Sequence, residues 1–243
     1  MASKTRSTNK LLHPLTLLGV WLVLAIALAF GPVDRADWAL ENILSAIFVA
    51  VLWLSYKRFP FSRVSYVLMF LFLVLHVVGA HYTYSKVPYD VWFESIFGRT
   101  LSSVFGFERN HFDRLVHFLY GLFLAYPMRE VFVRIAGVRG FWGYFLPLLM
   151  TMATSCLYEM IEWAAAIVVG GDLGAAYLGT QGDEFDSQKD MALATLGTAL
   201  SLVVVAIMHV RLARDFQAEW AESVRVKRAR PLGEVAIGEG KAP

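Results

Sequence analysis

Two glutamates one helical turn apart, Glu159 and Glu162, lie inside a long apolar segment of this 243-residue chain. An ionisable side chain within a membrane is costly unless it faces a cavity, has a partner or takes up a proton. Two carboxyls at this spacing repel each other, so one of them holds a proton unless a cation or a histidine lies between them. The pair therefore suits a general acid and base or a set of metal ligands. The alternative is an interhelical contact that only locks packing.

A second pair, Asp113 and His117, has the i,i+4 spacing that places both side chains on one face of a helix. This spacing fits two ligands of one metal, or a histidine that is oriented by its carboxylate. The alternative is a helix N-cap aspartate followed by a histidine at the membrane interface. Together with Glu159 and Glu162, these two residues are the candidate catalytic residues.

A short acidic stretch, residues 179–190, adds three aspartates with helical spacing. They favour a bound cation, and the alternative is an N-cap with first-turn acids that complement a helix dipole. The stretch lacks the ligand spacing of an EF-hand loop and the chain has no H-E-x-x-H string, so no standard metal motif applies. The candidate ligands for a divalent metal are Asp183, Asp186, Asp190 and His111, and the candidate substrate-binding residues are Arg114, Gln181, Gln188 and Trp163.

The composition decides the class of protein that must position these residues. Apolar residues make up 57% of the chain and charged residues 17%, with a mean hydropathy of +0.53. These charges are too few to cover a soluble globule of this size, so we expect an all-α, polytopic membrane protein. A single cysteine excludes an intrachain disulfide, and no basic patch interleaved with aromatics indicates a nucleic-acid partner.

Apolar runs of membrane-crossing length predict six transmembrane helices. A cleaved signal peptide is the alternative for the first run. Pro127 marks a kink or an exit from the fourth helix, after which residues 128–138 have the pattern of an interfacial helix. In the long connection 82–110, an apolar face on Trp92, Phe93, Ile96 and Phe97 predicts a short surface helix. The six predicted spans are 11–30, 38–56, 64–80, 113–126, 141–169 and 191–210.

The distribution of basic residues predicts the orientation in the membrane. Of the 22 lysines and arginines, 16 fall in the N-terminus, in the loops at 57–63 and 129–139 and in the C-terminal tail. The other six fall in the opposite loops. The positive-inside rule then places both termini in the cytoplasm and the acidic stretch outside. The expected organisation is a cytoplasmic N-terminus over 1–10, a transmembrane domain over 11–210 and a basic cytoplasmic tail over 211–243.

Three strings carry a resemblance to a known family: HFDRLVHF (111–118), YEMIEW (158–163) and LGTQGDEFDSQKDM (178–191). They resemble the uncharacterised bacterial inner-membrane family typified by YjdF, over most of the chain from the second helix to the sixth. More distantly the chain is similar to the VanZ-like family, whose helices start with Asp-Lys-x-x-His, carry a Glu, and contain Asp-x3-Asn-x2-Gly. The corresponding residues here are Asp113, Arg114, His117, Glu159 or Glu162, Asp190, Ala194 and Gly197.

The departures from the VanZ-like pattern are Arg114 for the Lys and Ala194 for the Asn, and any mechanism that needs that amide is in doubt. The resemblance implies a multi-pass protein of the bacterial inner membrane that acts at the cell envelope. Our leading hypothesis is an outward-facing acidic and histidine site that binds or processes a lipid or lipid-linked envelope substrate. A divalent metal is a candidate cofactor, and membrane lipids are the expected partners. The alternatives are a proton-coupled transporter and a non-catalytic envelope scaffold; the sequence leaves open the oligomeric state and whether the chain is an enzyme.

Overall fold

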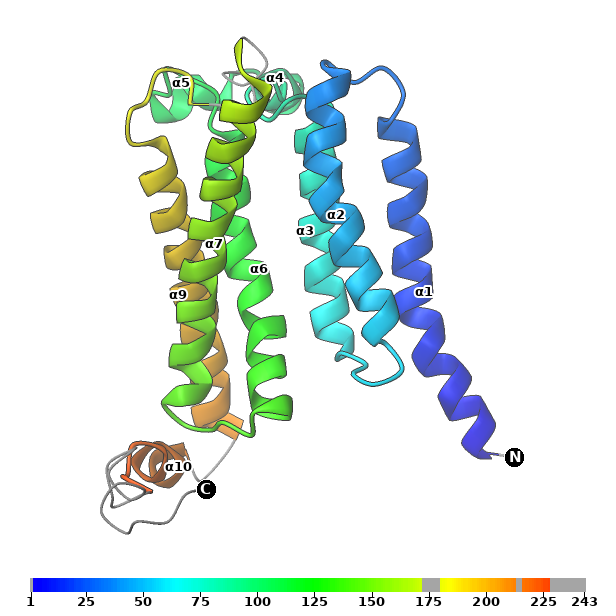
Figure 1. Cartoon of the computed structure of the whole chain (residues 1–243), viewed down its shortest axis with the longest axis vertical. Helices are drawn as coiled ribbons and strands as arrows, with labels where there is room; N and C mark the ends of the chain where they lie inside the picture. The colour runs from blue at the N-terminus through cyan, green and yellow to red at the C-terminus, as the bar shows by residue number, and fades with distance from the viewer. Residues whose placement is uncertain (1, 172–179, 213–215, 228–243) are drawn as a thin grey trace, which may run out of the picture.

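The computed structural model describes residues 2–171, 180–212 and 216–227, and this part of the chain is helical without strands. Figure 1 shows long helices running side by side, with two short ones across one end. The fold class is therefore all-α, as predicted. The helices are α1 (Ala2–Leu28), α2 (Arg35–Ser55), α3 (Arg63–His81), α4 (Tyr89–Phe97), α5 (Leu101–Phe105), α6 (Phe112–Ile135), α7 (Trp142–Val169), α9 (Asp186–Leu212) and α10 (Phe216–Ser223).

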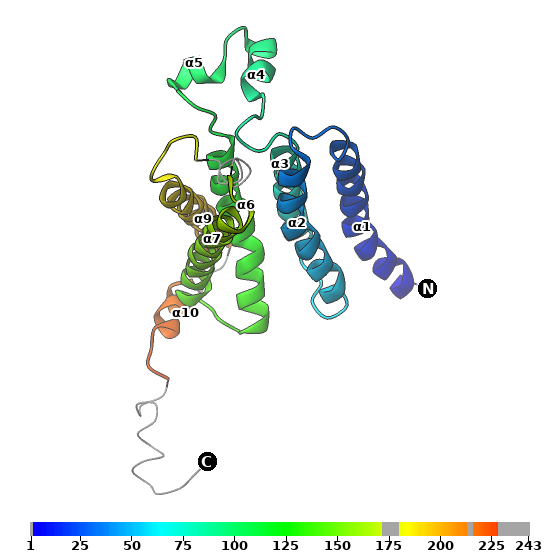
Figure 2. The same cartoon turned by 45° about the horizontal axis from the view of Figure 1, so that its top comes forward.

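The long helices form two groups of three. The N-terminal group contains α1, α2 and α3, and the C-terminal group contains α6, α7 and α9; α3 packs against both α1 and α6 and so joins the groups. We call the end where α2, α6 and α9 begin the site end. The short helices α4 and α5 lie at this end, as Figures 1 and 2 show, and α10 lies at the opposite end. The short helix predicted from Trp92 and its neighbours is α4.

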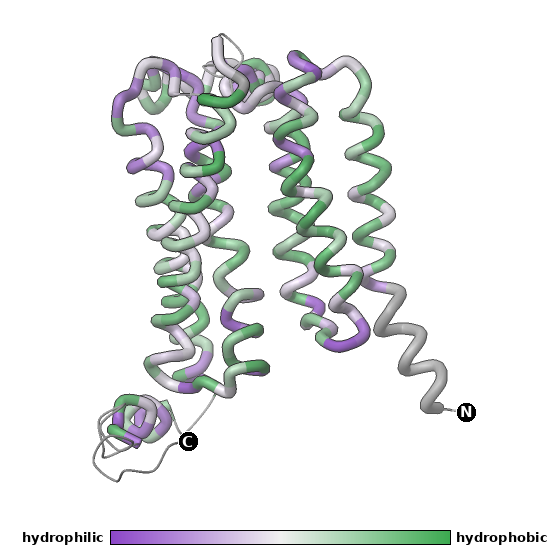
Figure 3. The backbone as a smooth tube through the Cα atoms, in the orientation of Figure 1, coloured by the Kyte–Doolittle hydropathy of each residue, from purple (hydrophilic) through white to green (hydrophobic). Residues whose placement is uncertain are grey.

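Helix α2 buries polar residues and exposes apolar ones. The buried residues of α2 are Asp37, Glu41 and Ser45, spaced one turn apart, whereas Ile43 and Ile47 on the other faces are more than half exposed. This inverted arrangement is expected where lipid surrounds the protein, because lipid tails solvate apolar side chains and not charged ones. Figure 3 shows hydrophilic residues gathered toward the two ends of the bundle and apolar residues between them.

Four of the described helices, α2, α3, α7 and α9, are long and apolar enough to cross a membrane. The first helix contributes a shorter apolar stretch, His13–Leu28. Pro127 does not end the fourth predicted helix: α6 runs unbroken to Ile135, so the predicted exit and the separate interfacial helix at 128–138 are wrong. Pro127, Leu124 and Ala125 are all buried, and this packing offsets the backbone hydrogen bond that a proline removes, a cost of about 3 kcal/mol.

Two glycines let α6 and α9 approach until their backbones touch. A Cβ atom on Gly121 would lie 1.8 Å from the carbonyl oxygen of Ala194, and one on Gly197 would lie 2.0 Å from that of Phe118. Thr198 donates a hydrogen bond across the same contact to the carbonyl oxygen of Gly121, at 3.1 Å. Small residues at such contacts are a common device of helix packing in membranes. The contact fixes the register of α6 against α9, and with it the polar side chains one turn nearer the site end.

Candidate functional site

An arginine clasp, formed by Arg109 and Arg114, ties the start of α6 to the acidic stretch before α9. Arg109 Nη2 lies 2.5 Å from Asp186 Oδ1, and its Nη1 donates to the carbonyl oxygen of Thr180. Arg114 Nη2 contacts Asp183 and lies 3.1 Å from Asp186 Oδ1. The residues at 109–114 and 180–186, about 70 apart in sequence, therefore meet at the site end.

The charges of the clasp are matched within it. Hydrogen bonds from Lys189 and from the Phe185 backbone N–H, together with Arg114, hold the pKa of Asp183 well below its usual range. Burial, and then the positive charges of Arg114 and Arg109, lower the pKa of His111. The neutral His111 ring accepts a hydrogen bond from Arg114 Nη1 at 3.2 Å. Asp183 and His111 thus already have protein partners.

Next to the clasp lies an acid-histidine cluster formed by Asp113, His117, Glu159 and Asp190. His117 Nε2 lies 3.7 Å from Asp113 Oδ1 and 3.5 Å from Glu159 Oε1. One ligand atom each of Asp113, His117 and Asp190 lie within 4.8 Å of one another. His117 and Asp190 are buried, at 8% and 2% exposure. Such a group can move a proton between carboxylate and imidazole or hold a cation.

A hydrogen-bonded chain on α2 and α3 approaches the same region from the N-terminal group. His76 Nε2 lies 3.1 Å from the carbonyl oxygen of Glu41, so this nitrogen carries the proton and donates. The other ring nitrogen, Nδ1, must then accept, and Tyr84 donates its hydroxyl proton to it. Tyr158 of α7 donates to Glu41 Oε2 at 3.2 Å and so links the two helix groups.

Glu162 lies on α7 one helical turn after Tyr158 and close to the same acids. It interacts electrostatically with Asp113, Glu41 and Glu159. Carboxyls this close repel one another when all are ionised, so such a group favours a protonated carboxyl beside an ionised one, the arrangement expected of an acid and base pair.

A cavity of about 340 Å³ lies between the two helix groups, and Asp113 and His117 of the acid-histidine cluster line it. Its walls come from α2, α3, α6 and α7 and are mostly apolar, including Phe48, Phe72 and Val116. Its polar lining residues are Ser45, His76, Tyr84, Asp113, His117, Tyr120, Thr154, Ser155 and Tyr158. An apolar chamber with a few convergent polar groups is the usual form of a small-molecule site, for which roughly 300–1,000 Å³ is common.

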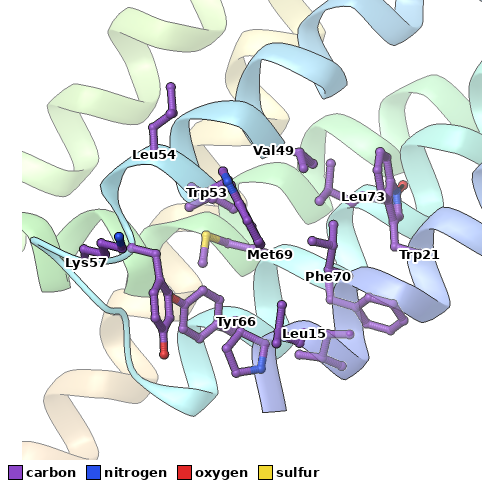
Figure 4. A pocket seen from close by; sticks show the side chains of 15 residues that line it. Leu15, Trp21, Val49, Trp53, Leu54, Lys57, Tyr66, Met69, Phe70 and Leu73 are labelled. Carbon is purple, nitrogen blue, oxygen red and sulfur yellow. Dashed lines mark hydrogen bonds between the residues drawn. The ribbon is translucent and has the colours of Figure 1, made fainter. Parts of the chain in front are cut away.

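A second and larger cavity, of about 530 Å³, lies within the N-terminal group and toward the opposite end (Figure 4). Leu15, Trp21, Trp53 and Phe70 are among the apolar side chains that line it, and Lys57 stands at its edge. No carboxylate or histidine lines it. Its size alone therefore does not make it the site of chemistry.

The structure brings some of the predicted site residues together and separates others. Asp113, His117, Glu159 and Asp190 converge, and Glu162 lies near enough to interact electrostatically with Asp113 and Glu159. Asp183 and Asp186 contact the arginine clasp, and Gln181 exchanges hydrogen bonds with the backbone of Asn110. The Trp163 side chain is 60% exposed on the outside of α7, and Gln188 is exposed. The catalytic and metal roles assigned to these residues remain predictions.

Sequence reasoning missed the polar face of α2. Asp37 precedes the predicted span 38–56, and Glu41 and Ser45 lie inside it without being identified as site residues, although all three are buried. The signal was present in the sequence, because the three residues recur every fourth position as one face of a helix requires. Tyr84, which completes the chain to His76, lies in a loop and carries no such periodic signal.

These features define a helical membrane protein with a polar site enclosed between two helix groups. The family model described as "Predicted membrane protein (DUF2238)" matches residues 13–211. The chain is 36% identical over 212 residues to "Inner membrane protein YjdF" of Escherichia coli (strain K12), an alignment that covers 86% of this chain and 97% of that protein. No solved structure matches the chain.

The chain therefore belongs to this family of membrane proteins, as the strings at 111–118, 158–163 and 178–191 predicted, and it is an inner-membrane protein. The similarity to the VanZ-like family stays a prediction.

Proposed function

We propose that this protein crosses the inner membrane six times, with both termini in the cytoplasm, and that its site binds and processes a lipid or a lipid-linked envelope substrate from the outer side. The support for the orientation is that the basic segments at 57–63 and 129–139 lie toward the end of the bundle opposite to the acid-histidine cluster. The organisation into a cytoplasmic segment at 1–10, a membrane domain at 11–210 and a tail at 211–243 is part of the same proposal.

The observation that carries the proposal is the form of the 340 Å³ cavity. An apolar wall leading to Asp113, His76 and His117 matches a ligand that has an acyl chain at one end and a polar group at the other. A soluble polar metabolite would leave the walls at Phe48, Phe72 and Val116 without complementary contacts. In this arrangement the reacting group of the substrate lies at Asp113 and His117.

Within this proposal the roles of the acids follow from their contacts. Glu162, beside Glu41, is the general base that takes the proton of the attacking water, and a proton held by Glu41 passes to the leaving group as its bond to the substrate breaks. His117 lies between Asp113 and Glu159 and is held as their partner. The clasp arginines are paired with Asp186 and Asp183, and they hold the acidic stretch beside this site. Hydrolysis or group transfer at an ester or phosphoester fits these roles.

A proton-coupled transporter is the rival class, and it requires polar groups that continue toward the cytoplasmic end. Below Glu159 on α7 the buried polar residues are Ser155 and Thr151. Thr151 Oγ1 lies 3.4 Å from Met128 Sδ and 2.9 Å from Thr198 Oγ1, so its hydroxyl already has partners, and the next residue on that face is the buried Pro147. This pattern supports a site that is open on one side of the membrane rather than a path through it.

The test is whether a lipid occupies the cavity. Full-length protein purified in mild detergent should carry a bound lipid that native mass spectrometry detects, and Val116→Trp should remove it because Val116 lines the cavity. Leu115→Trp is the matched control, since Leu115 is the neighbouring residue on α6 and is 46% exposed. Equal lipid retention by both variants, or no bound lipid in the unaltered protein, would contradict the proposal.

A further inference from the structure

The acid-histidine cluster has the composition and spacing of a metal centre. We propose that Asp113, His117 and Asp190, with Glu159 as a fourth ligand, bind one divalent transition-metal ion, of which Mn²⁺ and Zn²⁺ are representative. This inference deepens the proposed function by giving that site an ion, but the binding of the ion is measurable whatever the substrate is.

The distances in the cluster are those between ligands of a common ion. His117 Nε2 is 3.7 Å from Asp113 Oδ1 and 3.5 Å from Glu159 Oε1, longer than a good hydrogen bond. With metal–ligand bonds of about 2.1 Å, neighbouring and opposite ligand atoms lie roughly 3.0 to 4.2 Å apart. The spread of up to 4.8 Å among the Asp113, His117 and Asp190 atoms requires an inward movement of a few tenths of an ångström.

Two oxygens of the cluster are buried without a hydrogen bond. Asp190 is 2% exposed, and its Oδ1 makes no hydrogen bond to any described residue. Glu159 Oε1 is likewise buried without a hydrogen bond. A buried carboxylate oxygen left unpaired is costly, so such atoms are expected to have a ligand. Both atoms belong to side chains that surround His117.

The cations nearest the cluster are already engaged. Arg109 and Arg114 are paired with Asp186 and Asp183. The three carboxyls of the cluster therefore face one another and the ring of His117. A divalent ion would offset this concentration of negative charge. One imidazole nitrogen with several carboxylate oxygens favours Mn²⁺, Fe²⁺ or Zn²⁺ over Ca²⁺ and Mg²⁺, which select oxygen ligands.

The contact between α6 and α9 holds two of the ligands in place. His117 lies four residues before Gly121, and Asp190 lies four residues before Ala194, the residue that Gly121 touches. Each ligand is therefore one helical turn from a point where the two backbones are in contact. A site built on two rigid helices at this distance from a fixed crossing is positioned before the ion arrives.

The experiment uses full-length protein in detergent micelles, stripped with EDTA and titrated with Mn²⁺ alone. We expect one Mn²⁺ per chain, with electron spin-echo modulation from a coordinated imidazole nitrogen. Asp190→Asn and His117→Gln should weaken binding by about tenfold or more. Glu130→Gln is the matched control: Glu130 is an acid on α6 whose partners, Ser62, Ser65 and Arg134, lie at the opposite end, so this variant should bind as the unaltered protein does.

The outcomes separate this inference from the proposed function. Folded protein that takes up no stoichiometric Mn²⁺ below about 1 mM, or Asp190→Asn that binds normally, overturns the metal site while leaving lipid retention to be judged separately. If His117→Gln does not fold, His76→Gln and His111→Gln replace it: both leave the cluster intact and must keep the nitrogen modulation, and its loss in either overturns the inference.

Discussion

Asp183 receives hydrogen bonds from two basic residues of very different exposure. Arg114, at 17% side-chain exposure, contacts both Asp183 and the buried Asp186, whereas Lys189 is 49% exposed and contacts Asp183. A charged hydrogen bond to a buried acid stabilises a protein more than an exposed ion pair does, because water and salt screen the exposed pair. The two basic residues should therefore contribute unequally to the closure of the site end.

At this scale we predict that Arg114→Gln destabilises the protein more than Lys189→Gln. Loss of the Arg114 contact to Asp186 should lower the free energy of unfolding by about 2 kcal/mol, which corresponds to roughly 5 °C in the midpoint of thermal unfolding. Lys189→Gln should shift the midpoint less, and 0.5 M salt should reduce its effect further. Thermal unfolding of both variants in the same detergent measures the order, and a larger shift for Lys189→Gln would refute it.

Site residues could be predicted from the sequence where they recur at helical spacing. They could not be predicted where their role depends on a partner that is distant in the sequence. Glu159 and Glu162 are recognisable as acids in an apolar helix. That Asp186 pairs with Arg109, while Asp190 faces His117, depends on how segments about 70 residues apart meet. Glu41 escaped notice because one acid hardly changes the mean hydropathy of a long apolar run.

Among the elements, the crossing of α6 and α9 depends on two glycines, and we predict that neither tolerates a methyl group. Gly121→Ala and Gly197→Ala would place a Cβ within 2.0 Å of a backbone carbonyl oxygen, which no side-chain rotation relieves. Each should cost about 1–3 kcal/mol or more by forcing the helices apart.

Gly143→Ala, on α7, is the control for the glycine variants, because its Cβ would meet neighbours at an ordinary 3.9 Å. It should leave the thermal midpoint unchanged or raise it, since alanine favours a helix. If Gly121→Ala and Gly143→Ala melt at the same temperature, the contact between α6 and α9 is looser than described.

At the element scale hydropathy located each long helix, but not all of their ends. The continuation of α6 through Pro127 could not be read from local propensity, since the burial of Leu124, Ala125 and Pro127 within the bundle outweighs it. The start of α9 at Asp186 rather than at Met191 has a similar origin. The Arg109 and Arg114 contacts to Asp186 stabilise a first turn that hydropathy alone does not reveal.

For the whole molecule, the proposed orientation predicts opposite labelling of the two ends. In a Cys156→Ser background, a cysteine at Glu184 should react with a membrane-impermeant maleimide in intact cells, because Glu184 is exposed at the site end. A cysteine at Arg58, exposed in the loop at the other end, should react only after the cells are broken. Cys156→Ser alone gives the background. Labelling of the Arg58→Cys protein in intact cells would contradict the proposed orientation.

The joint between the two helix groups also bears on how a ligand arrives. The groups pack together through α3 and α6, while α2 meets α7 through the Tyr158 contact to Glu41. The two groups therefore pack along α3 and α6 on one side, and on the other side the contact between Tyr158 and Glu41 joins α2 to α7. A lipid would then enter laterally from its own leaflet, between α2 and α7. Its acyl chain would lead, and the lipid would stay within the hydrocarbon layer. Entry between α2 and α7 would break the hydrogen bond from Tyr158 to Glu41, because this contact joins the two helices there.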